Sequence, residues 1–215
     1  MQFTIEMQKA PWLDPTNINK QIRFGTARGL TNTAKEAQKA VVVANRGKFI
    51  IRNQWLEQSN KFGIRITPAT KETLTAEVKT AAYWLPLQDK GGTKLPYKNW
   101  LAIPTTNVRP TPSALIPKAL WPKNLKNSFE ITTKAGLHLL CVRGVLGATK
   151  KGAQKLLGPR SSKGQSSDLL VMYVLVKKAK IQKVDIWEEP IRTVSALRLE
   201  PNVATAIKEA IASSK

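Results

Sequence analysis

Residues 26–44, "TARGLTNTAKEAQKAVVVA", carry apolar side chains at the spacing of one helix face. These apolar positions are Leu30, Ala34, Ala37, Val41 and Ala44. Steps of three and four residues return to the same side of a helix, so we expect a helix from Thr26 to about Asn60. It is either continuous or divided into two at Gly47, and it starts either near Thr26 or at a capping box of Thr33 and Glu36. Because most residues of this face are small, another element can approach the helix closely.

Two alternating segments follow the helix and predict a β-hairpin. Residues 63–67 and 73–80 both alternate apolar and polar side chains, and "PATKE" between them is short enough for a turn. We expect this hairpin to pack against the helix that precedes it.

The second half of the chain predicts further strands and a final helix. Residues 128–132 and 137–143 are expected to pair as antiparallel strands. Residues 169–176 form a run of eight apolar side chains, which is typical of a strand buried on both faces or lying at an interface. Pro201 is expected to open a C-terminal helix, because proline is favoured at the first helical position.

Residues 86–126 differ in composition from the rest of the chain. Six of the 13 prolines lie between Pro96 and Pro122, and proline removes an N–H donor and fixes φ, so no long regular element is expected there. The same segment carries Tyr97, Trp100 and Trp121, large apolar groups that a disordered linker would not need. We expect an extended, ordered arm that packs either on this molecule or on a neighbour.

Together these patterns predict an α+β fold, with residues 1–215 forming a single domain. A long N-terminal helix and a C-terminal helix are expected to pack on an antiparallel β-sheet. Residues 86–126 are expected to form the proline-rich extended arm of this domain.

The chain is strongly basic, with 35 Lys and Arg against 14 Asp and Glu and a formal net charge of +21. Such a surplus favours nucleic acid, an acidic protein surface or a membrane face as the partner. No stretch approaches the ~18 apolar residues of a membrane span, and the N-terminus lacks the apolar region of a signal peptide. We therefore expect a protein that is used in soluble form and has no membrane partner.

The positive charge is dense between residues 86 and 165, where 14 basic residues stand against two acidic ones. Lysines interleaved with aromatic side chains can hold a phosphate backbone and stack on bases. The alternative is a solvated lysine surface whose aromatic residues serve packing. The candidate contacts to DNA or another anionic partner are Lys90, Lys94, Lys98, Lys123, Lys126, Lys150, Lys151, Lys155, Arg160 and Lys163. The candidate anchors of the arm at an interface are Tyr97, Trp100 and Trp121.

Residues 89–94, "DKGGTK", contain the glycines, the hydroxyl and the lysine of a phosphate-binding loop. The Walker order requires Gly-Lys-Ser/Thr before a helix, whereas Thr93 precedes Lys94 here. Pro86 and Pro96 flank the stretch, so we expect no helix whose N-terminus could hold phosphate. A glycine turn at the start of a basic arm is the remaining interpretation.

Residues for other catalytic or metal chemistry are scarce. His138 is the one histidine and Cys141 the one cysteine, and residues three apart on a strand point to opposite faces. We expect His138 to be an ordinary strand residue and Cys141 a small core hydrophobe. The sequence therefore predicts no catalytic residue, no cofactor and no metal.

Four stretches carry a resemblance to a known family. They are "ARGLTNTAKEAQKAV" at 27–41, "FIIRNQWL" at 49–56, the hairpin at 63–80 and "LLVMYVLVKKAKIQKV" at 169–184. With the order of the predicted elements, they resemble minor tail and tail-completion proteins of tailed bacteriophages. The similar families are the lambda-like minor tail protein Z family and the related tail-component family of HK97-like phages.

The resemblance implies a structural role with no active site. Such a protein is a homo-oligomeric, ring-forming subunit at the neck, which completes the tail for joining to the head. Its implied partners are other neck and tail proteins (connector, tail terminator or tube), and it resides in the virion after assembly in the host cytoplasm. An unpaired apolar strand and an extended arm would then join neighbours, and the basic charge would face DNA in the channel or acidic adjoining rings.

A second hypothesis is a sequence-nonspecific DNA- or RNA-binding protein. The same basic residues support it. Neither zinc-finger spacing nor an aromatic RNA-recognition signature is visible in the chain, so any binding would be independent of sequence.

If the tryptophans anchor an arm on a neighbour, Trp100→Ala combined with Trp121→Ala impairs assembly more than it impairs folding of the monomer. Light scattering during size-exclusion chromatography reports assembly, and thermal unfolding reports folding. A monomer that unfolds far earlier would instead place these tryptophans in its own core.

Overall fold

The computed structural model describes residues 15–148, 154–157 and 168–213, and the chain divides into two compact units. The helical unit comprises residues 1–48, 54–85 and 185–215, and the sheet unit comprises residues 49–53 and 86–184. The sequence had led us to expect a single domain. Two units are present because apolar side chains of residues 86–126 pack in the core of the sheet unit.

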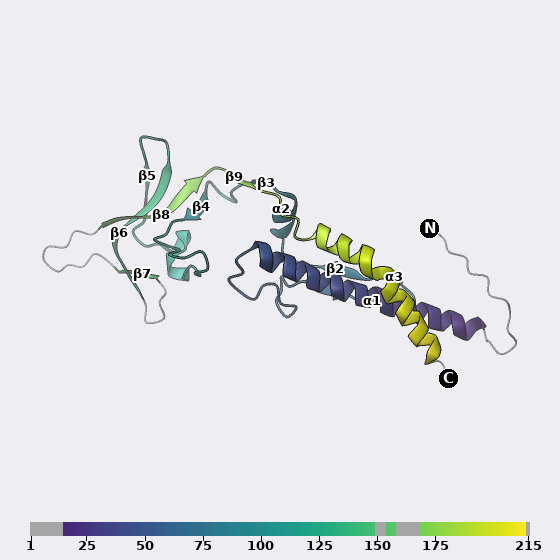
Figure 1. Cartoon of the computed structure of the whole chain (residues 1–215). Coiled ribbons are helices and arrows are strands. Elements are labelled where there is room, and N and C mark those ends of the chain that lie inside the picture. Colours follow the sequence, from purple (N-terminus) through teal and green to yellow (C-terminus); the bar gives the residue numbers. More distant parts are fainter. Residues whose placement is uncertain (1–14, 149–153, 158–167, 214–215) are drawn as a thin grey trace. The chain divides into compact units, whose positions relative to one another are not determined.

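The helical unit consists of two long helices and a short hairpin (Figure 1). Its elements are α1 (Pro15–Lys48), β1 (Arg65–Thr67), β2 (Glu77–Lys79) and α3 (Glu188–Ala212). β1 and β2 pair antiparallel with Ile66 opposite Val78. The α+β class, the long N-terminal helix, the C-terminal helix and the antiparallel pairing of the predicted hairpin are confirmed.

Both helices begin earlier than the sequence suggested. α1 starts at Pro15 and ends at Lys48, so the predicted continuation to about Asn60 is wrong. α3 starts at Glu188 and contains Pro201 in its interior. The acidic first turn of α3 is favourable at the positive end of the helix dipole, and an exposed proline is accommodated thirteen residues further on.

α1 packs on α3 through residues spaced by four. These buried residues are Gly25, Gly29, Thr33, Ala37, Val41 and Asn45. A Cβ atom on Gly29 would lie 2.5 Å from Val203 Cα, and one on Gly25 would lie 2.6 Å from Ile207 Cα. Real Cβ atoms do not approach so closely, so the two helix backbones meet where α1 has no side chain. The apolar spacing identified this part of α1 but not its two glycines.

A polar group beside the glycines fixes the register of the two helices. The Thr33 hydroxyl donates to Gly29 O (3.0 Å) and accepts from Asn202 Nδ2 (3.1 Å). Asn202 Nδ2 also donates to Glu36 Oε1 (3.3 Å), and Arg198 Nε donates to Glu36 Oε2 (2.8 Å). The hydrogen bond from Arg198 is the main reason that the pKa of Glu36 lies below its ordinary value.

The sheet unit contains a five-stranded antiparallel sheet and a separate two-stranded ribbon. The sheet has the order β4-β8-β6-β5, with β7 also paired to β6. Its strands are β4 (Leu101–Pro104), β5 (Phe129–Thr132), β6 (His138–Ala148), β7 (Gln154–Leu157) and β8 (Asp168–Val176). The ribbon consists of β3 (Gly92–Lys94) and β9 (Ala179–Ile181), and the short helix α2 (Leu85–Lys90) precedes β3.

β8 lies inside the sheet with a partner on each edge. It pairs with β4 through Ile103 and Val174, and with β6 through Leu139 and Val174. The strand expected at 169–176 is present, and it has a partner on each edge over Tyr173–Leu175. It is therefore not the unpaired apolar strand that the family resemblance implies.

Residues 105–126 cover one face of the sheet and supply part of its core. They contain two 3-10 turns, η1 (Lys118–Leu120) and η2 (Pro122–Asn124). The buried core consists of Val108, Leu120, Leu125, Val142, Met172, Tyr173 and Leu175. The Tyr173 hydroxyl donates to Leu120 O (2.7 Å) and holds the covering segment on β8. The sequence left open whether the proline-rich segment packs on its own molecule or on a neighbour. Residues 105–126 pack on their own molecule.

Gly29→Ala should destabilise the helical unit by roughly 1–3 kcal/mol, because the added methyl group forces the helix backbones apart. Gly47→Ala is the matched control in the same helix, since a Cβ atom there meets nothing within 4 Å. It should stabilise the unit by up to about 1 kcal/mol through helix propensity. Chemical denaturation followed by circular dichroism measures both, and equal effects of the two variants would contradict close packing at Gly29.

Candidate nucleic-acid and assembly interface

The positive charge of the chain is divided unequally between the two units. The sheet unit has 19 Lys and Arg against three Asp and Glu, a formal charge of +16. The helical unit has 16 against 11, a formal charge of +5. The sheet unit is therefore the part of the chain that most strongly attracts an anionic partner.

A group of exposed lysines gathers on the β3–β9 ribbon and beside it. In the pairing of the ribbon, Lys94 lies opposite Ala179 and Thr93 lies opposite Lys180. We call the group the lysine ribbon: Lys90, Lys94, Lys98, Lys177, Lys178 and Lys180. None of the six forms an ion pair with a carboxylate in the part of the chain that the structure describes.

The glycine pair of "DKGGTK" forms the turn from α2 into this ribbon. Gly91 and Gly92 have φ angles of 72° and 141°, which side chains other than glycine rarely adopt. A Cβ atom on Gly91 would also lie 2.8 Å from Lys183 N. α2 ends before the glycines, so the negative end of its dipole meets the turn, and a phosphate would be repelled there. The predicted glycine turn is confirmed.

The other predicted basic contacts are distributed over the unit. Lys123 and Lys126 are exposed in the segment that covers the sheet, and Lys123 Nζ lies 5.6 Å from the centre of the Trp121 ring. Lys155 lies in β7, opposite Gly147. Lys150, Lys151, Arg160 and Lys163 fall outside the described residues. Lys177, Lys178 and Lys180 were not among the predicted contacts, although "KKAK" is visible in the sequence, because β3 and β9 are far apart in the chain.

The three candidate aromatic anchors have different surroundings. Tyr97 is 99% exposed, and Trp121 is 39% exposed with its Nε1 donating to Ile116 O (3.2 Å). Trp100 is half-buried and packs on the core of the sheet unit. Its ring centre lies 4.4 Å from that of His138 and 3.9 Å from Lys177 Nζ. Tyr97 and Trp121 are therefore accessible to a partner, whereas Trp100 also has a structural role.

The face of the sheet opposite the covering segment is apolar and only half-buried. One row of paired side chains crosses the strands β4, β8, β6 and β5 in the order Ile103, Val174, Leu139 and Ile131. We call the following residues of this face the open face: Leu101, Ile103, Ile131, Leu139, Val174 and Val176. None of them is buried, and none belongs to the hydrophobic core of the unit. Ile103 is the most accessible, at 45% exposure.

Cys141 and His138 both lie in β6 but have different surroundings. Cys141 is fully buried, and this burial raises the pKa of its thiol, which keeps it protonated and unreactive. His138 accepts or donates a hydrogen bond with the Thr132 hydroxyl (3.1 Å). Among the described residues, no group of three His, Cys, Asp or Glu side chains is placed to hold a metal ion.

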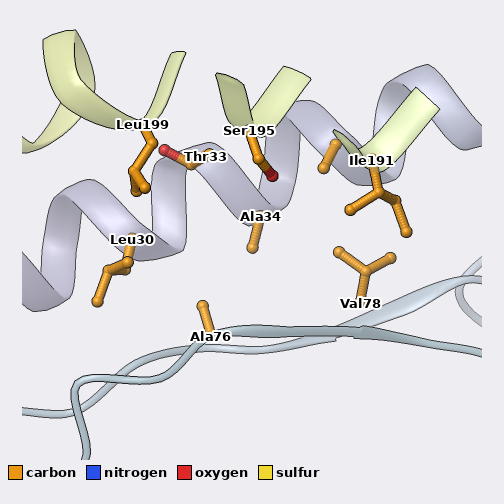
Figure 2. A pocket seen from close by; sticks show the side chains of 9 residues that line it. Leu30, Thr33, Ala34, Ala76, Val78, Ile191, Ser195 and Leu199 are labelled. Atoms are coloured by element: carbon orange, nitrogen blue, oxygen red, sulfur yellow. The ribbon is translucent and has the colours of Figure 1, made fainter. Parts of the chain in front are cut away.

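The helical unit contains an open apolar pocket of about 260 Å³ between α1, β2 and α3 (Figure 2). It is lined by Leu30, Thr33, Ala34, Ala37, Ala76, Val78, Ile191, Ser195 and Leu199. Its polar side chains are the two hydroxyls, and no titratable side chain lines it. The Thr33 hydroxyl already bonds to Gly29 and Asn202. The pocket therefore offers an apolar surface and no acid–base chemistry.

Comparison of the chain with protein-family models, with curated proteins and with solved structures gives no match in any of the three. Separately, no helix within residues 15–148 and 168–213 is long and apolar enough to span a membrane.

The two tryptophans should now respond differently to truncation. Trp100→Ala should lower the free energy of unfolding by about 2–3 kcal/mol, because it removes core packing and the contact with Lys177. Trp121→Ala should cost about 1 kcal/mol or less, since the ring is exposed and gives up one hydrogen bond. Urea unfolding followed by fluorescence measures both, and a larger loss at Trp121 would contradict this assignment.

Proposed function

We propose that the protein is a non-enzymatic structural subunit of a tailed-bacteriophage virion. It forms a homo-oligomeric ring at the neck and completes the tail for joining to the head. The observation that carries the proposal is the sheet unit, which combines an open apolar face with a formal charge of +16. The family resemblance in the sequence supports the same role.

The open face supports assembly because apolar surface in water is stabilised by burial. A neighbouring copy that covers Ile103 and its row removes that surface from water. In the described part of the chain β4 pairs only with β8 and β5 only with β6, so each leaves one edge for strand addition. Contacts between different patches of adjacent copies close into a ring when the rotation between them divides a full turn.

The lysine ribbon supports a second contact of the ring. Exposed lysines without carboxylate partners repel one another until an anionic surface lies opposite them. DNA passing through the channel supplies such a surface without any need for sequence recognition, and an acidic adjoining ring does the same.

Ile103→Lys should reduce oligomer formation, because it places a charge in the centre of the proposed interface. Leu115→Lys is the control, since Leu115 is 63% exposed in the same unit but lies outside the open face. Sedimentation velocity measures the distribution of oligomers, and thermal unfolding checks that both variants fold. Unchanged assembly of Ile103→Lys would remove the open face as the interface between copies.

The alternative function, sequence-nonspecific binding of DNA or RNA, is favoured by the unpaired lysine ribbon alone. Replacing Lys94 and Lys180 by Gln should lower the salt dependence of duplex binding by about 0.9 per lysine in a log–log plot. Replacing Lys35 and Lys39 of α1 by Gln is the charge-matched control.

Two further measurements decide between the two functions. Tight duplex binding by a protein that never forms rings would favour the alternative. Absence of the chain from purified virions analysed by mass spectrometry would exclude a structural virion role.

A further inference from the structure

A rigid turn follows β4 and is held on a bulge of β8. The β6–β8 register passes from Leu140–Tyr173 to Cys141–Val171, so Met172 is the extra residue of β8. Thr105 and Asn107 use the carbonyls at this bulge. Thr105 N donates to Met172 O (3.0 Å), its hydroxyl lies 2.7 Å from Val171 O, and Asn107 Nδ2 donates to Val171 O (2.9 Å). The backbone of the turn is thereby fixed on the sheet.

The turn presents the side chain of Arg109. The amides of Val108 and Arg109 donate to Thr105 O (3.1 and 2.9 Å), and Val108 is fully buried in the core. Arg109 is half-buried, and its Nε is shielded from solvent with no hydrogen-bond acceptor. A shielded donor without an acceptor is unfavourable and is uncommon in folded proteins.

A second arginine is held beside the first. Arg52 Nε donates to Pro112 O (2.7 Å), three residues after Arg109. Burial and then the nearby positive charge of Arg52 place the pKa of Arg109 below its ordinary value. Within the described chain, neither guanidinium forms an ion pair with a carboxylate. Two adjacent positive charges, one of them partly removed from water, thus stand without a counter-charge.

We propose that Arg52 and Arg109 form a binding site for a phosphate group. A guanidinium is a planar fork of N–H donors that matches the oxygens of a phosphate, and among the described residues the terminal N–H groups of Arg109 and Arg52 have no hydrogen-bond acceptor. A phosphate group presents acceptor oxygens in more than one direction, so one group can accept from both arginines, whereas the two oxygens of a carboxylate lie on one side. Free phosphate also carries up to two negative charges, and a backbone phosphate of nucleic acid carries one. The site takes either free phosphate or a backbone phosphate of nucleic acid, and it stands independently of the proposed assembly.

The test compares unfolding of the full chain in sodium phosphate and in sodium chloride at equal ionic strength and pH 7. Phosphate at about 100 times its Kd should raise the unfolding midpoint by roughly 5–10 °C over chloride. Arg109→Gln and Arg52→Gln should each lose this rise, with phosphate binding weakened at least about tenfold. In chloride Arg109→Gln should not unfold earlier than the wild type, because it relieves the repulsion between the arginines and removes a shielded donor without an acceptor. Arg52→Gln also loses the hydrogen bond to Pro112 O, so the response to phosphate is compared with chloride within each variant.

Lys134→Gln is the matched control, since it removes one exposed positive charge from the β5–β6 turn of the same unit. It should keep the full response to phosphate. A measurement without variants checks the same site: phosphate should slow modification of Arg52 and Arg109 by phenylglyoxal and leave the exposed Arg143 unaffected. Both results together assign the phosphate to this pair of arginines.

Titration of a single-stranded oligonucleotide separates the two sources of phosphate. If the site takes a backbone phosphate, both arginine variants bind the oligonucleotide more weakly and inorganic phosphate competes with it. If the site takes free phosphate, oligonucleotide binding is unchanged while the response to inorganic phosphate is lost. A response to phosphate no larger than to chloride, an equal response to acetate, or an equal loss in Lys134→Gln would overturn the proposal.

Discussion

The helical unit depends on one close contact, the approach of the α1 and α3 backbones at Gly25 and Gly29. Without side chains there, α1 meets α3 at Ile207 and Val203, and the hydrogen bonds of Asn202 and Arg198 align beside the contact. The contact joins the first described helix of the chain to the last. The segment 86–184, which makes up most of the sheet unit, lies between these two helices in the sequence.

The sheet unit has two faces with different environments. The segment 105–126 buries one face, and the hydroxyl of Tyr173 and the side chains of Thr105 and Asn107 hold that segment in place. The other face presents aliphatic side chains that no residue of the unit's core covers. Most of the positive charge of the chain lies in this unit. An apolar face and a basic surface on one unit allow two kinds of contact to be made at once, one with a protein and one with an anion.

The sequence predicted those features that depend on neighbours in the chain. The apolar spacing of Ala34, Ala37 and Val41 identified the buried face of α1, and alternation located the β1–β2 hairpin. The run of eight apolar side chains located β8, and the antiparallel pair β5 and β6 was also predicted. The glycine turn before β3 also followed from local chemistry. The predicted C-terminal helix started at Pro201 and was therefore too short, since α3 starts at Glu188. Proline is a strong start signal, and in the prediction it outweighed the acidic residues Glu188 and Glu189 of the true first turn.

Features that join distant segments could not be predicted in this way. The lysine ribbon arises from the pairing of Lys94 with Ala179, and the arginine pair arises because Arg52 reaches Pro112. The division into two units has the same origin, since it depends on which distant apolar groups meet. It also has a consequence for the speed of folding: Gly29 of α1 meets Val203 of α3, so the helical unit closes through a contact between segments that are far apart in the chain. The β5–β6 hairpin is closed by the short segment between Thr132 and His138, and contacts of this local kind form faster.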